Sequence, residues 1–409
     1  MSAAEWGCFD DPDTFEGVDR YPELGYELSM PDAVRNLGGA ALHRLAQECG
    51  TLLQTVYKGT YPLSAKDADA LHAGIIAGET NLFTLARDGE LSGMAALVNQ
   101  DNRLGGEITF TELGRAVARP SDGYRAGVPM RPMLKYRLPW SQENLTGQDY
   151  LYSMTRSAAE GRGGSPSGRG IQSVWWGASK HGSQIPMVTT GASWAYKLHG
   201  IEPFTGFVSP VDPEQWVGAA SQHTLFTPTE ADRNAVSTLL TEGTRGRVKP
   251  HVVVDRQAPA AYDFAYNEMH GPSDAMAAKY VVTDRRTPLP ARSEEEVAAH
   301  LGEAISQKLV IEADVASTPR GAAIMRKLHE QGWTLAGWWP SEIEYGAVCP
   351  EFARVNPKRI EELVEPAHHP SYFDHNLPGT RRVLDNVYAK MLGAAITARE
   401  NVKSTIIID

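Results

Sequence analysis

The chain has 409 residues, a length typical of two or three domains. Hydrophobic residues make up 42% and charged residues 22%, which is ordinary for a soluble globular protein. Lys and Arg number 39 against 50 Asp and Glu, so the formal net charge is −11. This excess of negative charge argues against non-specific binding to nucleic acids or to anionic membranes.

Cysteine usage and the N-terminal segment indicate a cytoplasmic, reduced protein. The three cysteines form no CxxC pair, so we expect neither a disulfide framework nor a zinc knuckle. No uncharged apolar stretch approaches the length of a membrane span. Residues 1–30 are acidic, whereas an export signal is basic and then apolar. We therefore expect an acidic arm over residues 1–30, loosely ordered or lying on the body of the protein.

Hydrophobic spacing and turn residues predict alternating helices and strands in the first half of the chain. In chain order, these are helices over 32–55 and 65–77, a hairpin over Asn81–Val98, a strand over Gly106–Pro120, a helix near Leu134–Leu138, a strand over Ile171–Ser179, a helix over Val188–Leu198 and a strand after Gly200. The Asp-Gly turn inside the hairpin is its strongest signal.

The same signals predict a similar order of helices and strands in the second half of the chain. Its predicted elements are helices over 229–243, Ser293–Gln307 and Thr318–Gly332, strands over Lys308–Val315, Trp333–Pro340 and Gly346–Val355, and a last helix over about 380–401. The helix that follows Ser293 opens with a capping-box pattern.

Four segments between residues 32 and 215 carry a family resemblance. They are the hairpin TLARDGELSGMAALV, the strand ELGRAVARP (Glu112–Pro120), the loop GYRAGVPMRPML (Gly123–Leu134) and the run GASWAYKLHGIEPFTGFV (Gly191–Val208). Together they resemble the GNAT (GCN5-related N-acyltransferase) superfamily, with a weaker similarity of Tyr57–Pro62 to β-lysine acetyltransferase-like members. The resemblance implies an α/β (α+β) fold in which helices flank a mixed central sheet.

The segment KLVIEADVASTPRGAAIMRKLHEQGWTLAGWWPSE is similar to the C-terminal half of the same fold, without its glycine loop. We therefore predict a tandem arrangement with one working site in the first unit. The predicted parts are the acidic arm (1–30), a GNAT acyltransferase domain (31–220), a degenerate GNAT-like domain (221–360) and a C-terminal extension with a helix (361–409).

The resemblance implies that an acyl-CoA, acetyl-CoA by default, binds at the glycine loop. The residues it assigns to this co-substrate are Val117, Arg119, Arg125, Ala126, Gly127 and Val128. Backbone N–H groups of such a loop and of the helix after it form an anion site. The loop departs from the family pattern in either of two alignments. If Gly127 takes the place of the first glycine, Pro129, which has no N–H, stands where the family has Gly or Ala, and if Arg125 is aligned instead, Val128 replaces the first glycine.

Acylation of an amine requires a base for the ammonium proton and an acid for the leaving thiolate. Glu112, on the predicted fourth strand, is the candidate base, and Glu107 is the second choice. Tyr196 lies four residues before Gly200, where many family members keep the acid. The residues expected to line the acceptor pocket or the donor channel are Tyr57, Tyr61, Trp175 and Trp176.

Other types of site are not expected. The residues His368, His369, Asp374 and His375 cluster near the C-terminus, but their spacing matches no established ligand frame, so we expect no metal. The patterns of P-loops, zincins, serine hydrolases and strand-anchored dinucleotide sites are missing from the sequence.

The leading hypothesis is an N-acyltransferase that moves a small acyl group to a primary amine of a small polar metabolite. The altered loop permits a second hypothesis, in which an acyl carrier protein or an aminoacyl-tRNA is the donor. Arginines of the first domain would then contact the phosphates of the RNA. A third hypothesis is a non-catalytic GNAT-like protein that binds a ligand. No membrane partner is expected, and the oligomeric state is left open.

Overall fold

The computed structural model forms two compact units, each of which combines helices with strands of a mixed sheet. It describes residues 26–57, 67–100, 102, 104–119, 140, 143–145, 147–156, 188–197, 200–244, 246–255, 263–269, 277–284, 291–362 and parts of 379–397. The first unit takes its described residues from the chain up to Gln100, from Thr109–Met187 and from Ser209–Val211. The second takes them from 101–108, from Val188–Val208 and from Asp212 onward. The predicted α/β class is confirmed.

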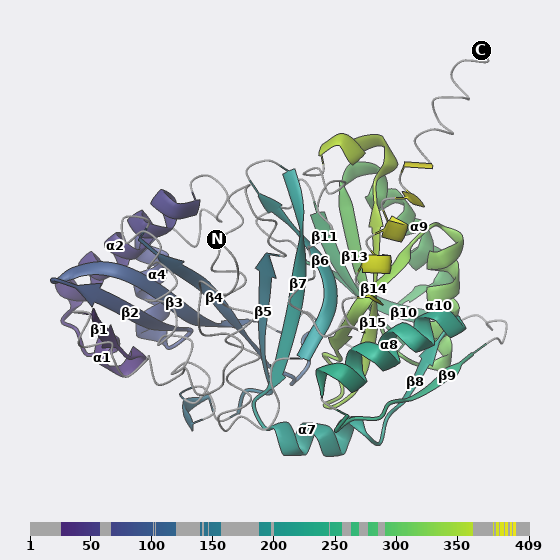
Figure 1. Ribbon diagram of the computed structural model, residues 1–409, viewed down its shortest axis with the longest axis horizontal. Helices are drawn as coiled ribbons and strands as arrows, with labels where there is room; N and C mark the ends of the chain where they lie inside the picture. Colours follow the sequence, from purple (N-terminus) through teal and green to yellow (C-terminus); the bar gives the residue numbers. More distant parts are fainter. Residues whose placement is uncertain are drawn as a thin grey trace, which may run out of the picture. The chain divides into compact units, whose positions relative to one another are not determined.

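The first unit contains helices α1 (Pro31–Arg35), α2 (Gly39–Tyr57) and α4 (Ala68–Ala77), and strands β1 (Tyr26–Ser29), β2 (Thr80–Arg87), β3 (Glu90–Gln100), β4 (Phe110–Ala118) and β5 (Tyr150–Arg156). The strands lie in the order β1-β2-β3-β4-β5 (Figure 1). The helices predicted over 32–55 and 65–77 are confirmed, with a break at residues 36–38 between α1 and α2.

Two strands of the first unit were not predicted. Residues Tyr26–Ser29 belong to the predicted acidic arm, which was expected to be loosely ordered or to lie on the body of the protein, and they form β1, which pairs antiparallel with β2. Strand β5 was not predicted at all, because the fifth strand was expected over Ile171–Ser179, which lies outside the described residues. The run YLYSMTR that forms β5 has alternating aromatic residues that favour a strand.

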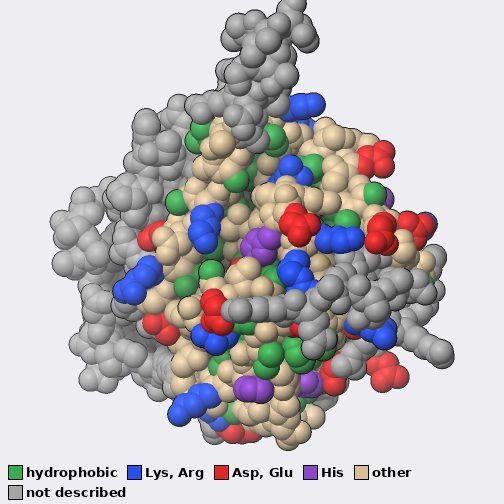
Figure 2. All heavy atoms as spheres, turned by 90° about the vertical axis from the view of Figure 1, so that its right-hand side faces the viewer, with side chains coloured by type: hydrophobic (Ala, Val, Ile, Leu, Met, Phe, Trp, Pro, Cys, Tyr) green, Lys and Arg blue, Asp and Glu red, His purple; other side chains and the backbone are tan. Residues whose placement is uncertain are grey.

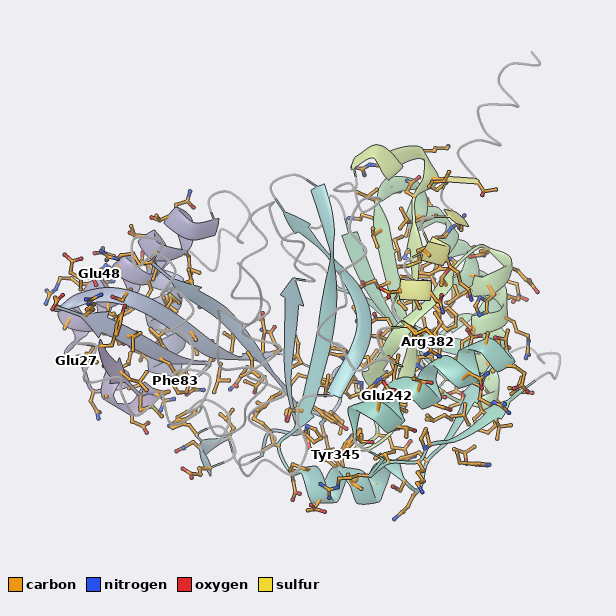
Figure 3. The ribbon with its side chains drawn as sticks, in the orientation of Figure 1. Glu27, Glu48, Phe83, Glu242, Tyr345 and Arg382 are labelled. Atoms are coloured by element: carbon orange, nitrogen blue, oxygen red, sulfur yellow. The ribbon has the colours of Figure 1, made fainter. Side chains whose placement is uncertain are left out.

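One apolar stripe of α2 forms the core of the first unit. Leu42, Ala46, Cys49 and Leu53 recur at helical spacing and are fully buried. They pack with α4 and with the helix-facing residues of β2, β3 and β4. Because side chains alternate along a strand, Phe83 points to the opposite face, where its ring meets Trp140 edge to face at 5.6 Å. Figure 3 labels Phe83 on β2 and the exposed Glu48 on α2.

The predicted hairpin is confirmed as β2 and β3. Asp88 and Gly89 both have positive φ, 54° and 79°, as the favoured two-residue hairpin turn requires. Asp67 caps α4 by accepting the backbone N–H groups of Asp69 and Ala70, and Gly78 ends that helix in the left-handed region. Local chemistry therefore fixes where the chain leaves α4 for β2 and where it turns from β2 into β3.

The prediction of a helix over Val188–Leu198 is wrong. These residues form β6 (Val188–Lys197), which pairs antiparallel with β7 (Gly200–Pro210). The run begins with three β-branched residues and contains Trp and Tyr, a composition that favours the extended backbone over the helix. The strand predicted after Gly200 is confirmed as β7.

The second unit contains helices α7 (Pro213–Ala220), α8 (Glu230–Gly243), α9 (Glu294–Gln307) and α10 (Pro319–Glu330), the short helix η6 (Pro357–Glu362), and strands β8 (Thr224–Thr227), β9 (His251–Val254), β10 (Asp263–Met269), β11 (Ala277–Thr283), β12 (Ala291–Ser293), β13 (Val310–Val315), β14 (Thr334–Pro340) and β15 (Val348–Val355). Its main sheet has the order β7-β6-β14-β15-β13-β11-β10-β12, and β8 pairs with β9 in a separate parallel sheet. The predicted α8, α9, α10, β13, β14 and β15 are confirmed.

Helices of the second unit cover one face of its main sheet. Tyr280 of β11 meets His300 of α9, and Phe352 of β15 meets His329 of α10, in edge-to-face contacts. The ring of Trp216 on α7 stacks on Trp338 of β14 at 6.3 Å. On the face of this unit shown in Figure 2, basic and acidic side chains are interspersed. The described side chains in this view form no single-sign patch of the kind that nucleic-acid binding uses.

A buried carboxylate ties α8 to α10 in the second unit. Asp232, 5% exposed, accepts hydrogen bonds from Thr229 Oγ1 at 2.6 Å and from His329 Nε2 at 2.8 Å. The other ring nitrogen of His329 lies 3.1 Å from the Trp333 carbonyl oxygen. One imidazole therefore joins the end of α10 to the start of α8.

We expect His329→Ala to lower the free energy of unfolding by about 1–3 kcal/mol, because Asp232 then stays buried without one of its donors. Urea unfolding of the full chain measures this change. His251→Ala, at an exposed position, is the matched control and should stay within about 0.5 kcal/mol of the parent chain. Equal stability of the two variants would show that the link carries no energy.

Candidate functional site

Strands β4 and β5 of the first unit run parallel, and their described pairs lie at the beginning of both strands. The pairs are Phe110 with Tyr150, Thr111 with Leu151 and Glu112 with Tyr152. Both strands continue past the last pair, to Ala118 and Arg156. The described ladder ends at Glu112 and Tyr152. We use the name fork for this place, and define it by Glu112, Gly114 and Tyr152 together with Gln100 of β3.

A reciprocal clamp fixes where the fork begins. Asp149 Oδ2 accepts the Thr109 backbone N–H at 2.9 Å and the Thr109 hydroxyl at 3.0 Å. In return the backbone N–H of Asp149 donates to Thr109 Oγ1 at 2.8 Å. One residue further on, the rings of Phe110 and Tyr150 stack at 5.4 Å. These contacts set the register of β4 against β5.

The carboxylate of Glu112 lies at the fork. Glu112 is half-buried, and Gln100 Nε2 donates to its Oε2 at 3.3 Å. A Cβ atom on Gly114 would lie 2.7 Å from Glu112 Oε1, so a larger residue at this position would displace the carboxylate. A carboxylate held by an amide donor where the described ladder ends is a suitable proton acceptor.

A β-bulge in β4 lies next to the fork. The register of β3 against β4 shifts by one residue between Met94 and Ala96, and Arg115 of β4 has a φ of 52°. A bulge leaves its extra residue outside the ladder and redirects the strand. The backbone N–H and C=O groups of β4 therefore change direction at Arg115, three residues after Glu112.

The structure places two of the predicted co-substrate residues. Val117 is 3% exposed and packs in the core with α2, so its side chain is not available to a ligand. Arg119 donates to Glu90 Oε2 at 2.7 Å and to the Leu91 carbonyl at 3.0 Å, which ties it to β3. The loop residues Arg125, Ala126, Gly127 and Val128 lie outside the described residues.

The remaining predicted site residues are placed only in part. Tyr196 lies in β6, where its backbone pairs with Ile201, so the helical position expected for it is wrong. Its side chain, like that of Tyr57 at the end of α2, lies outside the described residues, as do Tyr61, Trp175 and Trp176. Glu107, the second candidate base, is exposed in the loop before β4.

Sequence reasoning missed the partners of Glu112. Gln100 faces Phe110 across the β3–β4 ladder, one diagonal step from Glu112. The side chains of Gln100 and Glu112 meet because of the register of β3 against β4, which the bulge at Arg115 shifts. Thr109 and Asp149 were missed for a similar reason, because strand β5 was not predicted.

The second unit also contains a pair of parallel strands, but it leaves no described fork. Its β10 and β11 are antiparallel, β11 and β13 are parallel, and β14 and β15 form a hairpin. The β11–β13 ladder joins six pairs, from Ala277 with Val310 to Val282 with Val315. The parallel strands therefore stay together over almost their whole length.

The helix after β11 begins with negative charge. Ser293 and Glu296 form the predicted capping box at the start of α9. The Ser293 backbone N–H holds the pKa of the Glu296 carboxyl below its usual value, and a backbone hydrogen bond does the same for Glu295. Carboxylates already satisfy this helix start, so a diphosphate would meet repulsion there.

Comparison with known proteins finds likeness only among solved structures. No protein-family model and no curated protein matches the chain. The chain is similar to an N-acetyltransferase from Staphylococcus aureus Mu50, with 10% identity over 46% of this chain and 97% of that chain at a TM-score of 0.30. It is also similar to aminoglycoside 6'-acetyltransferase type Ii, with 14% identity, 46% and 98% coverage, and a TM-score of 0.30. A mutant spermidine N-acetyltransferase from Vibrio cholerae matches with 9% identity, 46% and 94% coverage, and a TM-score of 0.29.

The described part of the chain shows neither a membrane-spanning helix nor a cluster of metal ligands. No helix in it combines the length and apolarity needed to cross a bilayer. Within the same described ranges, no three His, Cys, Asp or Glu side chains are grouped in a way that could hold a metal ion.

Proposed function

We propose that the first unit is an N-acyltransferase of GNAT type. It transfers a small acyl group, acetyl by default, from a CoA thioester to a primary amine of a small polar metabolite. The observation that carries this proposal is the fork, where Glu112 is held by Gln100 beside a bulged strand edge. The order of helices, hairpin and strands around the fork follows the predicted family layout up to β5.

Glu112 of the fork is the proposed base of the reaction. The amine arrives as an ammonium ion, and Glu112 takes one of its protons, which frees the lone pair for attack on the thioester carbonyl. The C–N bond forms, the C–S bond breaks and the leaving thiolate takes up a proton.

Two features of the second unit support placing the reaction in the first. The parallel strands β11 and β13 of the second unit stay paired. They therefore leave no gap between them for the thioester of an acyl-CoA. The start of α9 bears Glu295 and Glu296, which disfavours a diphosphate. The acyl-CoA site is therefore proposed for the predicted loop Arg125–Val128 of the first unit.

Calorimetric titration of the full chain with acetyl-CoA tests the donor. We expect micromolar binding that Gly127→Glu abolishes, because a carboxylate then meets the diphosphate, and that Tyr196→Phe retains. Thermal unfolding of each variant confirms that the loss is not a loss of fold.

Failure of every acyl-CoA to bind would contradict the proposed donor. The same titration with an acyl carrier protein and with aminoacyl-tRNA then separates the alternatives. Binding of acetyl-CoA without turnover on any primary amine would instead support a non-catalytic ligand-binding protein.

A further inference from the structure

Four charged side chains lie together on one face of the main sheet of the second unit. Lys279 of β11 pairs with Glu312 of β13, and Asp314 of β13 pairs with Glu351 of β15. Paired residues and residues two apart point to the same side of a sheet, so all four share one face. We call them the buried charged group, because Glu312, Asp314 and Glu351 are only 6%, 1% and 4% exposed.

Direct contacts join the group around one ammonium. Lys279 Nζ is hydrogen-bonded to Glu351 Oε2 and lies 3.4 Å from Asp314 Oδ1. It also lies 4.7 Å from the centre of the Trp339 ring, a cation–π contact. The positive charge of Lys279 is thus divided between two carboxylates in a site almost closed to water.

Glu351 is the member whose surroundings most disfavour a negative charge. Burial raises the pKa of Glu351 well above its usual value, and the charges of Glu312 and Asp314 raise it further, while Lys279 acts in the opposite direction. Among the described residues, the titratable groups on this face are those of the buried charged group and the Cys349 thiol of β15. Strand β14 faces Glu351 with Gly337, which has no side chain.

We propose that Glu351 binds a proton at neutral pH and that this proton is part of the folded structure of the second unit. A protonated carboxyl keeps an acceptor oxygen for Lys279 and gains an O–H donor beside neighbouring carboxylates. Like charges packed this closely in a dry site share protons rather than ionise together. The proposal concerns the second unit alone and does not depend on the acyltransferase function of the first.

The proton links stability to pH with a definite sign. The pKa of Glu351 is higher in the folded than in the unfolded chain, so its contribution is fully present below the unfolded value of about 4.3. The contribution is lost as the pH rises through the folded pKa. Within that window the folded state holds one more proton, so the folding equilibrium constant falls about tenfold per pH unit.

Glu351→Gln tests the proposal, because glutamine has the shape of the protonated carboxyl and cannot ionise. Urea unfolding of the full chain is measured between about pH 5 and pH 9 for the parent chain and the variant. We expect the ratio of their folding constants to rise in favour of the variant by about tenfold per pH unit up to the folded pKa of Glu351 and to stay constant above it. Glu303→Gln, at an exposed position on α9, is the matched control and should show a constant ratio.

A ratio that does not change with pH for Glu351→Gln would overturn the proposal. A second measurement does not depend on the stability of the variant. Infrared spectra of the parent chain at pH 7 should contain the C=O stretch of a protonated carboxyl, and the band should vanish as the pH is raised. No such band in the folded parent chain would also overturn it.

Discussion

Glu112→Gln should lower kcat/KM for amine acylation by about 10²- to 10⁴-fold, the usual effect of losing a general base. The amide keeps the shape of the side chain and its contact with Gln100 but cannot take the ammonium proton. Because the loss concerns the proton transfer, we expect it in kcat, with KM for acetyl-CoA little changed. Steady-state rates with acetyl-CoA and a panel of primary amines measure both constants.

Three further variants make this test specific. Gly114→Ala places a methyl group where the Glu112 carboxylate lies, so it should reproduce part of the loss without changing any charge. Glu27→Gln, at an exposed position on β1 (Figure 3), should leave the rate unchanged. A large loss in Glu107→Gln with full activity in Glu112→Gln would move the base to the second candidate.

Gly321→Ala should destabilise the second unit by about 3 kcal/mol or more, the effect of severe overpacking. Gly321 lies in the first turn of α10, where its backbone N–H donates to Thr318 Oγ1 at 2.9 Å. A Cβ atom there would lie 1.8 Å from the carbonyl oxygen of Ala316, at the exit of β13. The backbone on both sides is fixed, because Ala316 donates to the Val282 carbonyl at 2.8 Å. Urea unfolding measures the loss.

Gly302→Ala is the matched control on the neighbouring helix α9. A Cβ atom there meets only Gln331 Nε2, at 4.0 Å, so the change removes backbone freedom from the unfolded chain without a clash. We expect a gain of about 0.5–1 kcal/mol. If the two glycine variants lose equal stability, the close approach of β13 to α10 is not the cause.

Turns and helix starts were predictable because a few neighbouring residues decide them. Asp88-Gly89 specified its hairpin through positive φ angles, and Ser293 with Glu296 specified the start of α9. The error over Val188–Leu198 has the same local origin. There the family motif suggested a helix, while the β-branched residues at the start of the run favoured the strand that the structure contains.

The sequence by itself determined the α/β class, the hairpin, most helices of both units and Glu112 as the candidate base. Only the tertiary structure decided which side chains meet. Gln100 reaches Glu112 through a ladder whose register a bulge shifts, and Lys279 reaches Glu351 across three strands. Such contacts depend on strand order and register, which arise from the packing of distant segments, and a one-residue change of register moves every side chain to the other face.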